Sequence, residues 1–436
     1  MDKKNIFRDF TKYVSLSIVG LVCVSIYILA DTFFISLALG PDGLTALNIS
    51  IVAFAIVNGF GLMIGIGGAT QYAIQKNKDE NTAEVFTHSL IAGLLVAIIF
   101  VVIGVFFTTP LAKVFGADST ILPLASVYMR TILCFAPVFI LNNILIAFIR
   151  NDNNPKLAMA GLITASFLNI VFDYLFIFPF SMGMFGVALA TGLAFTLSIV
   201  VLSIHFWTKS NKFNLHKCKI KIKEMVHLFS LGSSALINEL AFAISLIAFN
   251  LVILKIEGNI GVAAFGIVAN GALIVIYIFT GVAQGIQPLI SKGYGSGIKA
   301  LVNYTLKYAI IMVVAIAFVA YGITFFNTNL LVSVFNSNAD TVLAFFATNG
   351  LRLYFVGLVF AGINFVAAAF FSAIGSAKAA VIVSLLRSCV ISIPMVIILG
   401  VVLGMDGVWL SFVFTELIVS MLSITVLYRP FSSMKK

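Results

Sequence analysis

The sequence has 436 residues, of which 61% are hydrophobic and 10% are charged, with a formal net charge of +10. Soluble globular proteins average roughly 45 to 50% apolar and about 25% charged residues, so this composition excludes a water-soluble fold. Residues 90–107 are continuously apolar, whereas the strands of a membrane β-barrel alternate apolar and polar residues, so a barrel is excluded as well. The composition therefore predicts an all-α polytopic membrane protein.

Twelve transmembrane helices are predicted, because a spanning helix needs about 20 apolar residues and the sequence holds twelve such runs. The runs are separated by clusters of Gly, Pro, Asn, Asp and Lys. The predicted spans of the first half cover residues 14–39, 44–73, 85–109, 121–148, 157–180 and 184–207. Those of the second half cover residues 225–254, 260–290, 301–325, 340–371, 377–403 and 406–428.

The basic residues outside these spans concentrate in alternate loops. Segments on the same predicted side as the N-terminus hold nearly all of them, whereas Lys113 and Lys255 fall on the opposite side. Cytoplasmic loops of membrane proteins carry this excess of positive charge, so both termini are predicted to be cytoplasmic. The basicity thus reflects topology in the lipid bilayer, and we expect no nucleic-acid partner.

Residues 208–224 form the one long charged loop predicted, almost at the midpoint of the chain. Its lysines are Lys209, Lys212, Lys217, Lys219, Lys221 and Lys223. We interpret it as a cytoplasmic linker between an N-lobe of residues 1–207 and a C-lobe of residues 225–436. The lysines either fix the topology or hold the loop against anionic lipid.

An internal repeat relates the two predicted lobes at an offset of about 220 residues. The segment GMFGVAL at 183–189 recurs as GMDGVWL at 404–410, and Gly61 and Gly65 recur as Gly281 and Gly285. The repeat predicts two pseudo-symmetric six-helix lobes with the same orientation in the membrane. Duplicated lobes of this kind are one architecture of secondary transporters.

Four acidic residues fall inside the predicted spans, namely Asp31, Asp173, Glu239 and Glu416. A carboxylate at the bilayer centre costs roughly 2.5 to 3.5 kcal/mol on insertion scales, so each indicates a function. Asp31 lies eight residues before Leu39, which places it about 12 Å from the outer end of its span. Asp173 lies at a similar depth, about 10 Å from the end of span five.

Thr191 lies at the same depth in span six, and Asn169 precedes Asp173 by four residues on one helix face. We therefore expect Asp31, Asn169, Asp173 and Thr191 to form one site. Two carboxyls brought together in a low dielectric can bind and release a proton, and the same oxygens can ligate Na⁺. The alternative is a set of hydrogen bonds that pack the helices together.

The second predicted lobe carries Glu239 and Glu416 without an obvious acidic partner. Glu239 is a candidate contact for a cationic substrate or a coupling ion, and the alternative is an ion pair with a buried base such as Arg387. Arg130 and Arg352 occupy repeat-related positions near span ends, where a long side chain reaches outward to water. We expect structural roles for both arginines.

The sequence carries no motif for catalysis. The four histidines are scattered, and the chain lacks a phosphate-binding G-x-x-x-x-G-K-[ST] loop, a G-x-S-x-G elbow and an H-E-x-x-H metal motif. We predict a protein that is not an enzyme and has no cofactor beyond a coupling ion, H⁺ or Na⁺. The glycines of the Gly65–Gly68 segment are interpreted as sites of close helix packing or of flexibility in span two.

Several segments resemble the multidrug and toxic compound extrusion (MATE) transporter family, and in particular its bacterial branch of MepA-type and DinF-like exporters. The resemblance covers the whole chain and is carried by ADTFFI at 30–35, GIGG at 65–68, RNDNNP at 150–155, LNIVFD at 168–173 and GVALAT at 186–191.

The resemblance implies two six-helix bundles that alternate between outward-facing and inward-facing states and export organic cations in exchange for H⁺ or Na⁺. It implies a monomer in the bacterial cytoplasmic membrane. Asp31, Asn169, Asp173 and Thr191 match the first-lobe cation site of the family, and Glu239 matches an acidic position of another branch. That branch has an acidic partner in span ten, where this sequence has Ile363 and Asn364. Some members bend span one at a proline, where this sequence has Leu16.

Two other functions compete with an exporter. A flippase for lipid-linked saccharides or cell-wall precursors handles anionic pyrophosphate and needs buried bases, of which Arg387 is the deepest. An ion channel or membrane scaffold does not need a pair of titratable acids.

Overall fold

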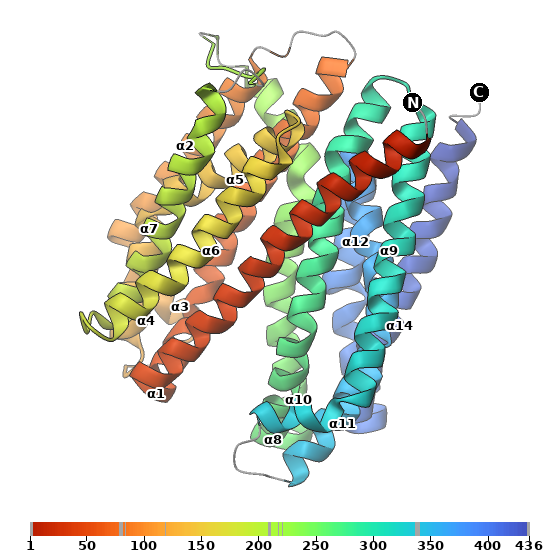
Figure 1. The fold of residues 1–436 in the computed structure, drawn as a ribbon. Coiled ribbons are helices and arrows are strands. Elements are labelled where there is room, and N and C mark those ends of the chain that lie inside the picture. The colour runs from red at the N-terminus through yellow and green to blue at the C-terminus, as the bar shows by residue number, and fades with distance from the viewer. Residues whose placement is uncertain are drawn as a thin grey trace. The chain divides into compact units, whose positions relative to one another are not determined.

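A computed structural model describes residues 3–77, 82, 84–117, 119–207, 211–216, 218–219, 221–335 and 341–433. These residues form helices joined by short turns and contain no strand (Figure 1). The helices before the linker are α1 (Lys3–Asn77), α2 (Val85–Phe106), α3 (Thr108–Val114), α4 (Leu122–Cys134), α5 (Ala136–Asn151), α6 (Pro155–Ile177), α7 (Gly183–Ser203) and the 3₁₀ turn η1 (Ile204–Trp207). Those after it are α8 (Ile222–Gly295), α9 (Lys299–Phe326), α10 (Thr328–Phe335), α11 (Thr341–Tyr354), α12 (Gly357–Ala373), α13 (Ala377–Leu385), the π-helical turn η2 (Leu386–Val390) and α14 (Ser392–Ser433).

Three glycines divide the longest helices into separate spans. Gly40 in α1, Gly258 in α8 and Gly404 in α14 have φ angles of 64°, 63° and 62°, which L-residues with a side chain rarely adopt. Gly258 and Gly404 are the repeat partners of Gly40 and Gly183, and Gly183 also has a positive φ. The chain therefore turns sharply at equivalent points of the two repeats.

The described helices account for the twelve predicted spans. Nine stretches are long and apolar enough to cross a membrane, and eleven result when the bent pairs α4–α5 (49°) and α11–α12 (48°) each count as one span. The last of these stretches, Ala377–Thr425, contains the break at Gly404 and so comprises two spans. The structure confirms the predicted all-α polytopic fold.

The chain divides into two compact units that do not coincide with the halves of the sequence. The first unit is Val19–Leu240, and the second unit is Met1–Ile18 together with Ala241–Lys436. The start of α1 thus belongs with the second unit, and the start of α8 belongs with the first. The predicted lobes, residues 1–207 and 225–436, remain a prediction from the repeat.

The start of α1 and the start of α8 each pack closely against a glycine of the unit to which they belong. In the first unit, a Cβ atom on Gly67 of α1 would lie 1.9 Å from the carbonyl oxygen of Leu228 in α8. In the second unit, a Cβ on Gly285 of α8 would lie 2.8 Å from the Cα of Val14 in α1. Small residues permit such approach between membrane helices. The contact at Gly67 confirms the interpretation of Gly65–Gly68 as a packing segment.

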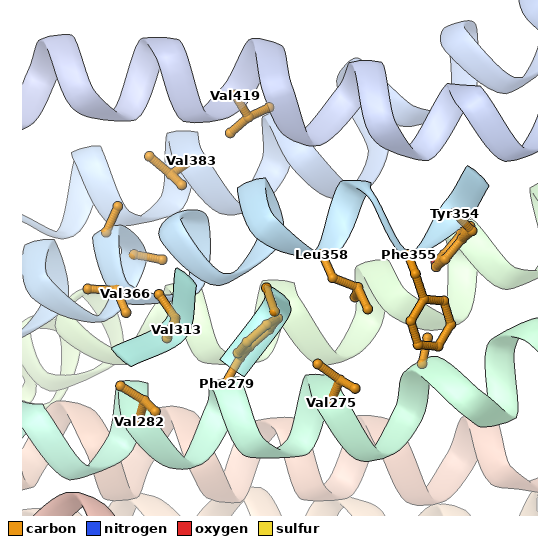
Figure 2. Close-up of a cluster of buried hydrophobic side chains, with 14 of the residues drawn as sticks. Val275, Phe279, Val282, Val313, Tyr354, Phe355, Leu358, Val366, Val383 and Val419 are labelled. Carbon is orange, nitrogen blue, oxygen red and sulfur yellow. The ribbon is translucent and has the colours of Figure 1, made fainter. Parts of the chain in front are cut away.

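The core of the second unit is a continuous apolar cluster. Figure 2 shows Val275, Phe279 and Val282 along α8, at the spacing of one helix face, packed against side chains from neighbouring helices such as Val313 of α9 and Leu358 of α12. All five are buried.

The described part of the predicted linker lies against the first unit. The ring of Phe213 is buried among aromatic rings of that unit, with centroids 4.7 Å from Phe86, 5.3 Å from His205 and 5.4 Å from Phe148. The amide of Lys212 donates a hydrogen bond to Asp152 Oδ2 at 2.7 Å. Residues 208–210, 217 and 220, including Lys209 and Lys217, lie outside the described residues.

Candidate functional site

Three helices of the first unit carry the predicted site residues. Asp31 lies in α1 ahead of the break at Gly40, Asn169 and Asp173 lie four residues apart on α6, and Thr191 lies on α7. Because a short turn joins α6 to α7, the two helices run antiparallel and pack along their length. This arrangement brings Asn169 opposite Thr191.

A hydrogen bond of 3.1 Å joins Asn169 Nδ2 to Thr191 Oγ1. The Thr191 hydroxyl donates in turn to the carbonyl oxygen of Val187 at 3.2 Å. The side-chain nitrogen of Asn169 therefore donates its hydrogen bond to α7, and the side-chain oxygen can accept from another group. Asn169 and Asp173 are fully buried at 0% exposure.

The carboxyl groups of Asp31 and Asp173 lie close enough for the charge of one to act on the other. Asp31 is buried as well, with 9% exposure. Tyr128 of α4 is buried and lies within electrostatic range of both acids. The structure thus brings the two predicted acids into one buried centre.

Four side-chain oxygens of this centre have no hydrogen-bond partner among the described residues. They are Asp31 Oδ1, Asn169 Oδ1 and both carboxylate oxygens of Asp173. A buried polar atom left without a partner costs about 1 to 3 kcal/mol, and more when it is charged. All four unpaired atoms are acceptors, so the centre fits a proton or an oxygen-liganded cation such as Na⁺.

Tyr128 and Tyr27 are neighbours of the acids that sequence reasoning missed. Tyr27 precedes Asp31 by four residues, so helical spacing alone places it on the same face. It is buried and lies within electrostatic range of Tyr128. Tyr128 comes from a different helix, and no sequence spacing relates it to either acid.

Glu239 belongs to the first unit, because the start of α8 packs there. Asn58 of α1 hydrogen-bonds the Glu239 carboxyl, and Asn143 of α5 donates to Asn58 Oδ1 at 2.9 Å. The alternative for Glu239, an ion pair with Arg387, is wrong, since Arg387 pairs with Glu416.

Glu416 is fully paired within the second unit. Arg387 Nη2 lies 2.8 Å from Glu416 Oε1, and Asn364 Nδ2 donates to Oε2 at 2.7 Å. The guanidinium also lies 4.0 Å from the ring centroid of Phe365. Arg387 stands in the π-helical turn η2, which displaces it relative to a regular helix. The second-unit acid therefore has a permanent counterion and differs from the acids of the first unit.

The structure also places several other positions that the sequence singled out. Arg130 and Arg352 are exposed, and the Arg352 guanidinium lies 5.3 Å from the ring centroid of Phe325. The described part of α1 departs from helical geometry at Gly40 and nowhere near Leu16. Asn364 stands near the place where the other branch of the family has an acidic partner in span ten. Its Nδ2 donates a hydrogen bond to Glu416 Oε2.

A sequence model of one protein family, described as MatE, matches residues 17–175 and 235–398. The multidrug export protein MepA of Staphylococcus saprophyticus is 26% identical over 431 residues, which cover 98% of this chain and 94% of that protein. MepA of a Staphylococcus aureus strain is 26% identical over 432 residues, with the same coverage of both chains.

Solved structures share the fold at low sequence identity. A multidrug resistance MATE family transporter in an outward-facing conformation has a TM-score of 0.91 at 22% identity, over 98% of this chain and 96% of that one. A superfamily transporter from Pyrococcus furiosus, described as having a binding pocket of reverse polarity, has a TM-score of 0.90 at 21% identity with the same coverage.

Proposed function

The chain belongs to the MatE family of transporters, and from this premise we propose that it exports small organic cations in exchange for H⁺ or Na⁺. The single observation that carries the proposal is the buried centre of the first unit. Its two acids lie within electrostatic range of each other, and three of their four carboxylate oxygens are buried without a hydrogen-bond partner in the described part of the chain. A transporter that couples to a cation needs such a group, whereas a scaffold does not.

The coupling ion would bind at the unpaired oxygens of Asp31, Asn169 and Asp173. A single proton shared by Asp31 and Asp173 would relieve the repulsion between the two carboxylates. A sodium ion would do so as well, with the Asn169 oxygen as a further ligand. Binding of a cationic substrate to the same acids would compete with either ion, and this competition is how we propose that export and ion entry are coupled.

Charge supports an organic cation as the substrate. The first unit buries Asp31 and Asp173 inside its spans, and Glu239 adds a third carboxyl to the same unit. Arg387, the base that lies deepest in the predicted spans, is paired with Glu416. A flippase for anionic pyrophosphate lipids would need an unneutralised base, so this pairing favours the exporter. MepA carries the name of a multidrug export protein, which agrees with a broad substrate range.

The distribution of basic residues supports a location in the bacterial cytoplasmic membrane with both termini in the cytoplasm. We propose that the single chain is the transporting unit, because the first unit holds all four residues of the candidate site.

Uptake of a fluorescent lipophilic cation into everted vesicles tests the proposal. A pH gradient and a Na⁺ gradient are imposed separately, and Asp31→Asn is compared with Asp42→Asn, which alters an exposed acid of the same helix. Accumulation under one gradient that vanishes in Asp31→Asn and persists in Asp42→Asn establishes the antiporter and names its ion. Accumulation under neither gradient would contradict the proposal and favour the flippase.

A further inference from the structure

A small polar cavity lies where the end of the linker meets α1 and α2, within the first unit. Its volume is about 110 Å³. Its walls consist of Gln71, Gln75, Glu84, Val85, His88, Lys221 and Glu224. The residues come from three segments, so the cavity exists only while the linker is docked on this unit.

Hydrogen bonds close the linker over this cavity. Lys221 Nζ lies 2.5 Å from Glu84 Oε2, and Gln71 Nε2 donates to Glu224 Oε2 at 2.6 Å. His88 Nδ1 lies 2.9 Å from the carbonyl oxygen of Glu84, which can only accept, so Nδ1 is the donor. His88 Nε2 lies 3.3 Å from both the amide nitrogen of Lys221 and the carbonyl oxygen of Lys219, so the ring contacts the backbone of the linker at two residues.

Two carbonyl oxygens of the lining, Gln71 Oε1 and Gln75 Oε1, are buried and have no hydrogen-bond partner among the residues that the structure describes. Gln71 is only 3% exposed. The orientation of its amide is fixed, because Nε2 donates to a carboxylate oxygen that cannot donate in return. Gln75 follows Gln71 by one helical turn, so both side chains lie on one face of α1. The cavity therefore presents acceptors that need a donor.

The charges of the lining indicate that this donor is a cation. Glu84 and Glu224 contribute two carboxylates, and Lys221 contributes one positive charge. The hydrogen bond from Lys221 keeps the pKa of Glu84 below its usual value, so this carboxylate is ionised at neutral pH. The two carboxylates thus outnumber the one lysine of the lining, which favours a positively charged donor.

The acceptor geometry favours an organic ammonium over a metal ion. Among the described residues, no group of three or more His, Cys, Asp or Glu side chains is placed to hold a metal. Both carboxylates already accept hydrogen bonds, and the other acceptors are neutral amides. The ammonium of Lys221 already occupies one carboxylate, which shows how this cavity accommodates such a group. A primary ammonium has three N–H donors to offer, whereas a quaternary ammonium has none.

We propose that this cavity, the linker pocket, binds one primary ammonium group through Gln71 Oε1, Gln75 Oε1 and the Glu224 carboxylate. The ammonium comes either from a soluble amine or from the headgroup of an ethanolamine phospholipid. Lys221 lies at the end of the linker, and Glu224 lies in the first turn of α8. A ligand that binds only the docked state stabilises that state, so the bound ammonium should stabilise the docked linker.

Thermal unfolding of the full chain in detergent tests the proposal with n-butylammonium as the probe. Trimethylbutylammonium is the matched control, because it carries the same charge without N–H donors. We expect a saturable rise in Tm with n-butylammonium and none with the control. Gln75→Leu removes an acceptor at similar volume and should raise the half-saturating concentration about tenfold, which corresponds to about 1.4 kcal/mol for one lost hydrogen bond.

Gln75→Glu adds a carboxylate at the same place and should lower the half-saturating concentration. This variant keeps the test valid should Gln75→Leu fail to fold. The Asp31→Asn background separates this pocket from the proposed transport site, and the shift should persist there. An equal rise in Tm with both ammonium compounds, or no rise with either, would overturn the proposal. A half-saturating concentration unchanged in both Gln75 variants would overturn it as well.

Lipid nanodiscs distinguish the two sources of the ammonium. If the headgroup fills the pocket, discs of phosphatidylethanolamine should abolish the effect of n-butylammonium, whereas discs of phosphatidylcholine should preserve it. If a soluble amine is the ligand, both kinds of disc should preserve it. Loss of the effect in both would contradict the proposal.

Discussion

The first and second units each bury acidic residues inside the predicted spans, and these residues differ in their partners. Asp173 in the first unit is fully buried, and neither of its carboxylate oxygens has a hydrogen-bond partner among the described residues. Glu416 in the second unit accepts hydrogen bonds from Arg387 and Asn364 on its two oxygens. Breaking a buried ion pair leaves an uncompensated charge, so the second arrangement is closed to an incoming cation. The two units thus differ in side-chain chemistry, and this difference supports the proposal that the coupling ion binds in the first unit.

The largest expected effect is the loss of transport in Asp173→Asn. An amide retains the shape of the side chain and removes the charge, so gradient-driven uptake should fall to the level of empty vesicles while the amount of protein in the membrane stays unchanged. Asp31→Asn should behave in the same way. Vesicle uptake corrected for protein content measures both, and normal uptake in the two variants would remove the site assignment.

Substitution of the second-unit acid should damage stability more than coupling. Glu416→Gln leaves the buried Arg387 without its counterion, which should cost about 3 to 5 kcal/mol of unfolding free energy. The double variant Glu416→Met with Arg387→Met removes both charges and should recover most of this stability. Thermal unfolding measures the first effect. If the double variant is stable yet completely inactive, the pair takes part in coupling and the comparison between the units fails.

Docking of the linker on the first unit should depend on Asp152. Burial raises the pKa of Asp152, but hydrogen bonds from His205, Lys76 and the Lys212 amide together lower it below its ordinary value. Asp152→Asn should speed hydrogen exchange at the linker roughly 10- to 100-fold, as expected for a lost charged hydrogen bond of about 1.5 to 3 kcal/mol.

The pH dependence of this docking follows from the direction of the shift. An acid with a lowered pKa stabilises the docked state above its unfolded pKa and loses that contribution as pH falls through the folded pKa. Exchange at Lys212 and Phe213, after correction for intrinsic rates, should therefore stay slow from neutral pH down to about pH 4, the usual range of an aspartate. Faster corrected exchange already at pH 6 would show that another group controls docking.

The smallest effects should come from the glycine contacts that both units share. Gly67→Ala places a Cβ against the Leu228 carbonyl and should cost about 1 to 3 kcal/mol, the usual range for overpacking. The contact at Gly285 is less tight, so Gly285→Ala should cost less. Gly322→Ala is the control, because no atom lies within 4 Å of its added Cβ. Thermal unfolding orders the three variants, and an equal effect at all three positions would refute the packing argument.

The periodic and depth-dependent features of this protein could be predicted from its sequence. Long apolar runs locate the spans, and the repeated glycines mark the breaks, because both signals are local in the chain. The shared depth of Asp31 and Asp173 also followed from counting residues along helices. That count was sufficient to anticipate a common buried centre.

Features that depend on helix rotation and on contacts between distant segments could not be predicted. An ion pair with Arg387 was the alternative for Glu239, but Arg387 lies in a π-helical turn and pairs with Glu416. Tyr128 reaches the acids from another helix. The docking of Phe213 depends on rings from four separate segments.

The most direct test of the ion-binding centre is the release of H⁺ or Na⁺ when tetraphenylphosphonium is added to the detergent-solubilised protein. We predict release of one of the two ions from the unmodified protein, detected with a pH dye or a sodium electrode, and its loss in Asp173→Asn. Release that is undiminished in Asp173→Asn, or the release of neither ion from the unmodified protein, would contradict the assignment of ion coupling to the first unit.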